Sequence, residues 1–141
     1  TNNYGPGQYV EKLIPKTIKY LRLGRKVPLH NHGTPRRMWL HADDTASAVM
    51  TVINSGVTNE IFNICGDTEL PNIEVVKSLI RMVCGEERNH INFIDFSFSR
   101  DGQDVRYSID DSKLRKLGWK PKKDFNKELE DIVNVSESFV W

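Results

Sequence analysis

Residues 33–44 have the sequence GTPRRMWLHADD, and this stretch decides the fold that the sequence predicts. Its glycine and proline indicate a turn, and the apolar residues from Met38 to Leu40 indicate a strand. Asp43 is typical of a helix N-cap, so a helix is expected over about 44–54, before Gly56. The stretch therefore predicts a strand that runs directly into a helix.

The segments on either side continue this alternation of helix and strand, which is typical of an α/β fold. Apolar residues at helical spacing, together with flanking glycines and prolines, set the expected boundaries. The other elements expected, in chain order, are a loop over 1–10, a helix over 11–24, strand, turn and strand over 27–42, a strand over 61–64, a helix from Asn72 to Gly85, strands over 91–96 and 105–109, a short helix from Asp110 or Asp111 to Gly118, and a last helix that begins at Asp124 or Asn126.

Two of these helices have an apolar face that is expected to point inward. In the helix over 44–54 this face consists of Ala46, Val49, Met50 and Ile53. In the last helix it consists of Phe125, Leu129, Ile132, Val133 and Phe139.

Length and composition indicate one globular unit over residues 1–141. The net charge of +1 gives no general attraction to nucleic acids or membranes, and no apolar run approaches the roughly 20 residues that a spanning helix needs. The N-terminal residues lack signal-peptide features, and without an initial methionine the sequence is expected to be a piece of a longer chain. Cys65 and Cys84 are expected to be reduced, which favours a cytoplasmic location.

Several polar motifs are candidate binding sites. They are Asn2-Asn3 within TNNYGP at 1–6, Arg36-Arg37 after the turn, Asn63 within FNICG at 62–66, and SRDGQDVRYSID at 99–110. Adjacent amides can bind a phosphate oxygen and a sugar hydroxyl, and a guanidinium group can bind two phosphate oxygens. Each motif also has a simpler structural explanation, as a turn, a solvated arginine pair or a polar residue that hydrogen-bonds within the fold.

In this order and spacing, the motifs resemble the C-terminal half of the extended short-chain dehydrogenase/reductase family over nearly the whole chain. TNNYGP at 1–6 with EKLIP at 11–15 is similar in particular to the dTDP-glucose 4,6-dehydratases, whereas LGWKP at 117–121 is shared more widely. The resemblance implies the substrate-binding part of an NAD(P)-binding, Rossmann-type α/β fold without its glycine-rich N-terminal half. In that family this half builds the cleft for a nucleoside diphosphate sugar and donates its last strands to the other half's sheet.

The resemblance also implies roles for individual residues. Asn2 and Asn3 would lie near the pyrophosphate, the sugar and the nicotinamide, while Arg37 and Arg100 would bind the diphosphate. The residues implied for the nucleoside and for the walls of the cleft are Lys12, Leu13, His30, Asn63 and Tyr107. We therefore expect Arg37 and Arg100 to point into one shared cleft, with Asn63 on its wall.

The sequence departs from the family pattern at several of these places. Met38 stands where an acidic residue is usual, His41 replaces an aromatic residue, Gln103 replaces a histidine of the dehydratases, and Asn31-His32 replaces a glycine-bearing turn. The departures leave the base and the sugar open, while both candidate phosphate-binding arginines are kept.

The residues that the family uses for redox chemistry are absent from the sequence. There is no glycine-rich G-x-x-G-x-x-G loop for NAD, no Tyr-x-x-x-Lys pair, and no Asp-Glu acid pair like that of the dehydratases. The resemblance therefore implies that NAD binds to the full-length parent, that none binds to this chain alone, and that the chain alone has no dehydratase activity. The expected partners are a dTDP- or UDP-hexose, the missing N-terminal Rossmann half and a second copy of the chain.

Self-association is expected because a half without its partner leaves apolar faces uncovered. The helix over 44–54 would expose its apolar face, and the strand over 61–64 would offer an unpaired edge.

Two classes of function stay open from the sequence. In the first, the chain is the substrate-binding part of an NAD-dependent nucleotide-sugar 4,6-dehydratase, or of a related UDP-sugar epimerase or UDP-glucuronate decarboxylase. In the second, it is a stand-alone binding or oligomerisation module without turnover. A metal site around His30, His32, His41 and Asp43 is a weaker hypothesis than their interpretation as polar loop residues.

Overall fold

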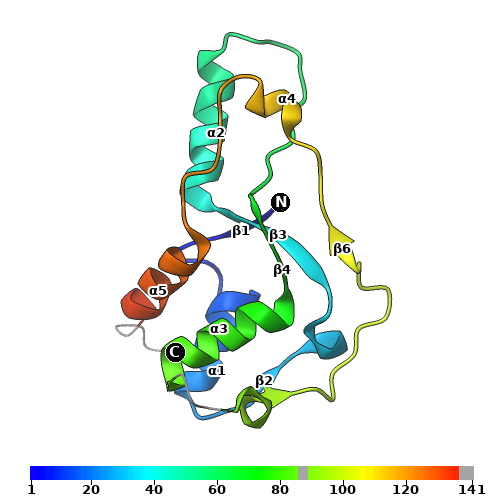
Figure 1. Ribbon diagram of the computed structural model, residues 1–141, viewed down its shortest axis with the longest axis vertical. Coiled ribbons are helices and arrows are strands. Elements are labelled where there is room, and N and C mark those ends of the chain that lie inside the picture. Colours follow the sequence, from blue (N-terminus) through cyan, green and yellow to red (C-terminus); the bar gives the residue numbers. More distant parts are fainter. Residues whose placement is uncertain (86–88, 137–141) are drawn as a thin grey trace.

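The computed structural model describes residues 1–85 and 89–136 and has an α/β fold (Figure 1). Its helices are α1 (Leu13–Arg22), α2 (Ala42–Asn54), α3 (Asn72–Cys84), α4 (Ser112–Arg115) and α5 (Phe125–Val135), with short 3-10 turns η1 (His30–Gly33) and η2 (His90–Phe93). Its strands are β1 (Asn2–Tyr4), β2 (Val27–Pro28), β3 (Arg36–His41), β4 (Thr68–Pro71), β5 (Ile94–Asp95) and β6 (Arg106–Tyr107). Helices and strands alternate along most of the chain, as the apolar pattern predicts.

The strands form two separate sheets, and β3 is the centre of the larger one. β3 pairs in parallel with β1 at Trp39–His41 and in parallel with β6 at Arg36 and Arg37, while β4 pairs antiparallel on the opposite edge. β1 and β6 thus follow one another along the same edge of β3, with Met38 between them. β2 and β5 form the second sheet. The described strands therefore do not close one self-contained sheet, as expected for a half that donates strands to another sheet.

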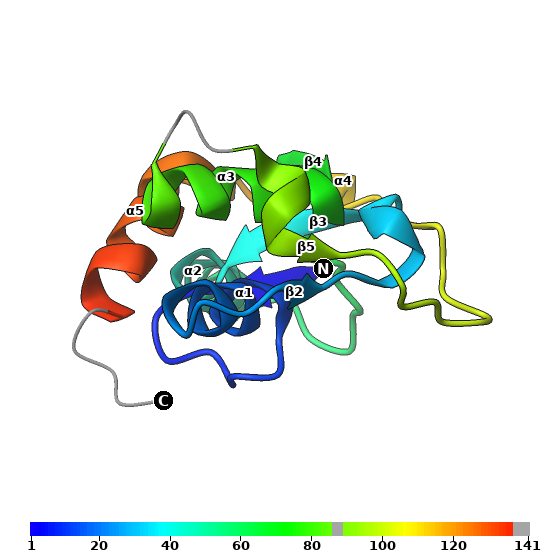
Figure 2. The same cartoon turned by 90° about the horizontal axis from the view of Figure 1, so that it is seen from below.

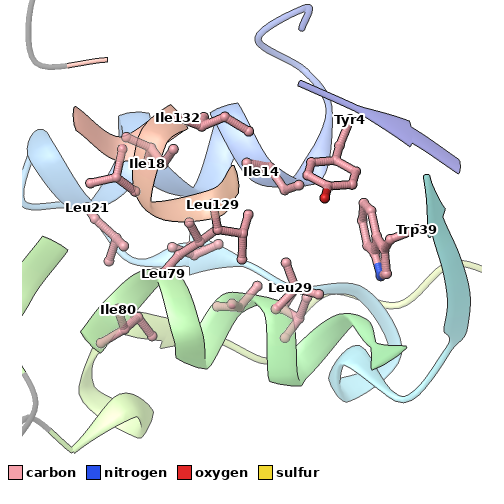
Figure 3. Close-up of a cluster of buried hydrophobic side chains, with 14 of the residues drawn as sticks. Tyr4, Ile14, Ile18, Leu21, Leu29, Trp39, Leu79, Ile80, Leu129 and Ile132 are labelled. Atoms are coloured by element: carbon pink, nitrogen blue, oxygen red, sulfur yellow. The ribbon is translucent and has the colours of Figure 1, made fainter. Parts of the chain in front are cut away.

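The main core lies between α1, α3 and α5, and Tyr4 and Trp39 connect it to the larger sheet (Figure 3). Its labelled side chains are Tyr4, Ile14, Ile18, Leu21, Leu29, Trp39, Leu79, Ile80, Leu129 and Ile132. Figure 2 shows α1 and α3 on opposite sides of this core, with α5 closing its end. Burial of a side chain such as Leu79, which is fully buried, contributes about 1.5–3 kcal/mol to stability.

α2 and α4 form a smaller lobe that extends away from the main core (Figure 1). A second apolar cluster holds this lobe together, with Leu40, Ala48, Leu114 and Trp119 at its centre. The indole N–H of Trp119 donates a hydrogen bond to Ser47 Oγ at 2.9 Å, which attaches the segment after α4 to α2.

The start of α2 is held by side-chain hydrogen bonds. His41 is the N-cap, since its Nδ1 accepts the backbone N–H of Asp43 at 3.2 Å, so the prediction of Asp43 as the N-cap is wrong. The buried carboxylate of Asp44 accepts the backbone N–H groups of Lys122 and Lys123 at 3.0 and 3.1 Å. A residue from the first third of the chain thus holds the segment that leads into α5.

The outer face of α2 is exposed. Val49, Met50 and Ile53 are 45%, 52% and 62% exposed, and Ala46 is exposed beside them. Their inward orientation, predicted from helical spacing, is therefore wrong for this chain. The exposed apolar face that was predicted for the same four residues is confirmed, and we call these residues the α2 patch.

Shorter segments also differ from the sequence-based predictions. Residues 2–4 form a strand rather than a loop, because they pair with β3. Residues 61–64 form no strand, and Ile61 is 86% exposed, so the predicted strand is wrong. The strand predicted over 91–96 begins with η2 and is a strand only at Ile94–Asp95. Phe139, predicted on the inner face of the last helix, lies outside the described residues.

Candidate functional site

A cleft of about 470 Å³ opens over β3, between the start of α1 and the first residue of α3. Its lining residues come from β1, the segment before α1, β3, the start of α3 and the loop before β6. They are Asn2, Asn3, Gln8, Lys12, Leu13, Arg37, Trp39, Asn72 and Gln103. Among these lining residues, Lys12 and Arg37 are cationic and no side chain is acidic. The cleft is therefore suited to an anion.

Arg37 is a buried cation that has no acidic partner among the described residues. Its side chain is only 7% exposed, its Nη1 donates to the carbonyl oxygen of Arg36 at 2.7 Å, and its guanidinium group lies 4.4 Å from the centre of the Tyr107 ring. Within residues 1–85 and 89–136, no carboxylate forms an ion pair with it. A buried charge is costly unless a counter-ion compensates it, so Arg37 is suited to binding an anion from outside the chain.

The neighbouring arginines differ from Arg37 in this respect. Arg36 and Arg106 both bind the carboxylate of Glu69, with Nε–Oε1 distances of 3.1 and 2.6 Å. The hydrogen bonds from Arg106 and then Arg36 lower the pKa of Glu69 to about 2. Both arginines thus have an acidic partner within the fold, which compensates part of their charge, whereas Arg37 has none among the described residues.

The alternation of side chains along β3 places Arg37 on the cleft side. Residues two apart on a strand share a face, so Arg37 and Trp39 both line the cleft. Trp39 also packs edge-on against Tyr4 and at a tilt against Phe125 of the main core, with ring centres 6.3 and 5.8 Å away. The core thus fixes the position of Trp39, which lines the cleft together with Arg37.

The start of α3 adds a favourable field for an anion. Asn72, the first residue of this helix, lines the cleft, and no side chain caps the helix N-terminus. The helix dipole favours negative charge at such an end, while the N–H of Asn72 itself donates to the carbonyl oxygen of Pro35 at 3.0 Å. Lys12, directly before α1, supplies a further positive charge from the opposite wall.

The amides of β1 lie along the same cleft. Asn3 Nδ2 donates to the carbonyl oxygen of Thr1 at 3.2 Å, and its Oδ1 accepts a hydrogen bond from the hydroxyl of Thr45. Gln8 Nε2 donates to the carbonyl oxygen of Asn3 at 2.7 Å. These contacts fix Asn3 and Gln8, and the half-buried Asn2 lies beside them.

The structure brings together Asn2, Asn3, Lys12, Leu13 and Arg37 among the residues predicted to bind substrate. Tyr107 does not line the cleft but contacts Arg37 through its ring. The hydroxyl of Tyr107 donates to Asp104, and this hydrogen bond raises its pKa.

Three other predicted residues lie outside the lining of the cleft. The ring of His30 packs edge-on against Phe98 with centres 5.7 Å apart. The backbone of Arg100 is hydrogen-bonded to the side chain of Asn31. Asn63 Nδ2 donates to the carbonyl oxygen of Asp110 at 2.9 Å. Of Arg37, Arg100 and Asn63, Arg37 lines this cleft and the other two do not, and the roles of all three as ligand contacts stay predictions.

The prediction missed four lining residues: Gln8, Trp39, Asn72 and Gln103. Trp39 could have been predicted from the sequence, because it lies two residues after Arg37 on a predicted strand and so shares its face. Asn72 could also have been predicted, because it is the first residue of a predicted helix. Gln8 and Gln103 lie in loops, whose course over the cleft no periodic pattern reveals.

The described residues give no support to the metal hypothesis. Within residues 1–85 and 89–136 there is no group of three His, Cys, Asp or Glu side chains that could hold a metal ion. His41 is instead buried as the N-cap of α2. In the same part of the chain, no helix has the length and apolar character needed to cross a membrane.

The architecture and the sequence match one family of proteins. A family model described as GDP-mannose 4,6 dehydratase matches residues 1–132. The chain belongs to this family. Members and structural neighbours of the GDP-mannose 4,6 dehydratase family include extended short-chain dehydrogenases/reductases that bind NAD, and this chain corresponds to their C-terminal part. The predicted family and fold class are thus confirmed.

Several similar proteins are dTDP-glucose 4,6-dehydratases. The enzyme of Streptomyces niveus is 38% identical over 134 residues, covering 94% of this chain and 39% of the relative. A crystal structure of the Bacillus anthracis enzyme in complex with NAD is 37% identical, with a TM-score of 0.85, covering 96% of this chain and 42% of that one. The Streptomyces venezuelae enzyme with NAD and TYD bound is 34% identical, with a TM-score of 0.87 and coverage of 96% and 41%. The chain thus spans about 40% of the length of these relatives.

Proposed function

We propose that this chain is the substrate-binding part of an NAD-dependent nucleotide-sugar 4,6-dehydratase of the dTDP-glucose type, a lyase. Its cleft binds the diphosphate of a nucleoside diphosphate sugar. The observation that carries this proposal is Arg37, a buried cation that lines the cleft and has no ion-pair partner in the described part of the chain. A diphosphate supplies the negative charge and the acceptor oxygens that a guanidinium group binds best.

The other lining residues suit the rest of such a ligand. Lys12 and the N-terminus of α3 flank Arg37 and favour a second phosphate group. Asn2 and Asn3 offer amide donors and acceptors of the kind that bind sugar hydroxyls. Leu13 gives one apolar surface for a base or a sugar ring. Identity of 34–38% to dTDP-glucose 4,6-dehydratases favours a dTDP-hexose over other nucleotide sugars.

The redox step belongs to a part of the enzyme that this sequence does not contain. NAD in that part accepts and returns a hydride, and the glycine-rich loop and Tyr-x-x-x-Lys pair that serve it in the family are absent here. The residues of this chain therefore bind and orient the sugar nucleotide. The α2 patch is the surface that we assign to contact with the N-terminal Rossmann half, because it is the apolar face of a helix left open to solvent.

Association with a second copy and a cytoplasmic location are part of the same proposal. An uncovered apolar face favours contact between copies when the other half is not attached. Reduced cysteines, predicted from their number and spacing, favour a reducing compartment.

Calorimetric titration of the chain with dTDP tests the proposed function. Arg37→Ala is expected to weaken binding by about 10- to 100-fold, since a hydrogen bond to a charged group contributes about 1.5–3 kcal/mol. Arg36→Ala is the matched control, because it removes an adjacent guanidinium group that already binds Glu69. Equal affinities of wild type and Arg37→Ala, or no binding by the wild type, would contradict the proposal.

A further inference from the structure

Asn31 holds the loop before β6 with four hydrogen bonds. Its backbone N–H donates to the carbonyl oxygen of Phe98 at 3.1 Å, and its Oδ1 accepts the N–H of Arg100 at 3.0 Å. Its Nδ2 donates to the carbonyl oxygen of Arg100 at 3.1 Å and to Oε1 of Gln103 at 3.0 Å. One side chain thus binds both backbone polar groups of Arg100 and a side chain that lines the cleft.

The backbone at Asn31 has a conformation that few residues adopt. Asn31 and His32 have φ values of 50° and 54°, and Gly33 follows with 71°, so η1 is a left-handed turn. Asparagine tolerates this conformation better than most residues, and glycine tolerates it best. A glycine at position 31 would therefore supply the same turn without the carboxamide. Figure 1 shows this turn, in blue before β3, beside the segment that leads to β6.

The contact with Asn31 determines which end of the Gln103 carboxamide is available. Oε1 of Gln103 accepts the hydrogen bond from Asn31, so Nε2 is the end left for a ligand. Within residues 1–85 and 89–136, Nε2 donates to no protein group, although the half-buried side chain lines the cleft. Gln103 and Arg37 therefore both offer N–H donors to the same space.

We propose that Asn31 is a positioning residue, which fixes the carboxamide of Gln103 so that Nε2 donates to an acceptor oxygen of a nucleoside diphosphate in the cleft. The inference rests on the proposed function and extends it to selectivity. With Oε1 occupied, Gln103 Nε2 donates to a phosphoryl or carbonyl oxygen of the ligand, and a donor group of the ligand is disfavoured at that point. An unrestrained glutamine could turn either end toward the ligand and would not select between them.

A pair of glycine substitutions tests the role of Asn31. Asn31→Gly keeps the left-handed turn and removes the carboxamide, and we expect it to weaken dTDP binding by about 5-fold, as the loss of one oriented hydrogen bond does. His32→Gly is the matched control, because it changes the next left-handed residue, whose side chain is exposed and does not bind Gln103. We expect its affinity to stay within about 2-fold of wild type. Equal losses in the two variants would overturn the proposal.

A double-mutant cycle separates positioning from a general structural role. If Asn31 acts through Gln103, the double variant Asn31→Gly/Gln103→Ala should bind dTDP within about 2-fold of Gln103→Ala alone. A purely structural loss would appear in both backgrounds, and fully additive losses would therefore overturn the proposal. Titration with inorganic pyrophosphate in the same variants shows whether the acceptor is a phosphoryl oxygen or lies on the nucleoside.

A measurement without ligand makes the inference independent of the proposed function. The side-chain amide hydrogens of Asn31 should exchange slowly by NMR in the wild type, and Gln103→Ala should speed their exchange. Fast exchange in the wild type would overturn the positioning role even if dTDP binds. Conversely, if Arg37→Ala leaves dTDP binding unchanged while Asn31 is protected, the proposed function fails and the contact between Asn31 and Gln103 remains.

Discussion

α1 and α2 have similar apolar spacing, yet only the apolar face of α1 is buried in the structure. Ile14 and Ile18 of α1 are 1% and 0% exposed, whereas Met50 and Ile53 of α2 are 52% and 62% exposed. α1 is covered by α3 and α5 of the same chain, and the outer face of α2 faces solvent. Periodic spacing thus identifies the apolar face of a helix. Only the folded chain shows whether another element packs against that face.

This difference in burial fits a chain that spans about 40% of the length of its relatives. The part with the cleft, α1, α3 and α5 buries its own core. The lobe of α2 and α4 has a smaller cluster and an open outer face. This division is consistent with the proposal that the first part binds the substrate and the second contacts a further part of the enzyme.

The largest expected effect concerns chemistry. We predict that the chain, incubated with NAD and dTDP-glucose, forms no 4-keto product, because the sequence has neither the glycine-rich loop nor the Tyr-x-x-x-Lys pair. A full-length dTDP-glucose 4,6-dehydratase serves as the positive control. Product that depends on this chain would show that the part with the cleft is more than a binding unit.

The contrast in burial predicts unequal losses of stability. Leu79→Ala, in the core of α3, is expected to lower the free energy of unfolding by about 2–5 kcal/mol, because it removes a fully buried side chain and leaves a cavity. Met50→Ala, in the α2 patch, is expected to change it by no more than about 0.5 kcal/mol. Urea unfolding measures both. A large loss in Met50→Ala would mean that α2 is covered in solution.

The open face of α2 predicts self-association. At micromolar concentration, light scattering should show a dimer or larger species, and Ile53→Lys should weaken association by about 10-fold or more, because a charge at an apolar contact must be desolvated. Val105→Lys is the control, since Val105 is 77% exposed but lies outside the α2 patch. A monomeric wild type with one cooperative thermal transition would contradict the prediction and favour a stand-alone module.

The smallest expected effect lies at the edge of the larger sheet. Arg106 and Arg36 lower the pKa of Glu69 from 4.5 to about 2, so the ionised group stabilises the folded state. For a lowered pKa, this contribution is complete above pH 4.5 and is lost as the pH falls toward about 2. The difference in urea midpoint between wild type and Glu69→Gln should therefore shrink from about pH 6 to about pH 3. A difference that does not depend on pH would show that Glu69 acts through packing instead.

The sequence predicts best the elements that local chemistry determines. α3 has clear signals at both ends, Pro71 before it and Gly85 after it, and the structure places the helix between them. β1 was missed because three polar or aromatic residues become a strand only by pairing with β3. The strand over 61–64 was predicted from its apolar residues, but no partner pairs with it in the described chain. Such elements depend on contacts far along the chain, which a local pattern does not contain.

The same distinction applies to the cleft. Asn2, Lys12 and Arg37 were predicted because they lie in motifs that resemble those of the family, and the structure brings them together. Gln103 was noticed only as a departure from the family pattern. Its place in the cleft depends on the contact with Asn31, which joins residues 72 positions apart. A contact of that range follows from the folded backbone and not from the residue types alone.

The hydrogen bonds to Asp44 have a consequence for how the chain folds during synthesis. The N–H groups of Lys122 and Lys123 that bind this carboxylate follow it by 78 and 79 residues. At roughly 5–20 residues per second, a ribosome makes these partners several seconds after Asp44. Until then the carboxylate must stay hydrated, and α5 has no fixed position beside α2. Closure of this long loop therefore comes late in folding, and a nascent chain stopped before residue 122 would present the surfaces of α1 and α3 that α5 covers in the finished protein.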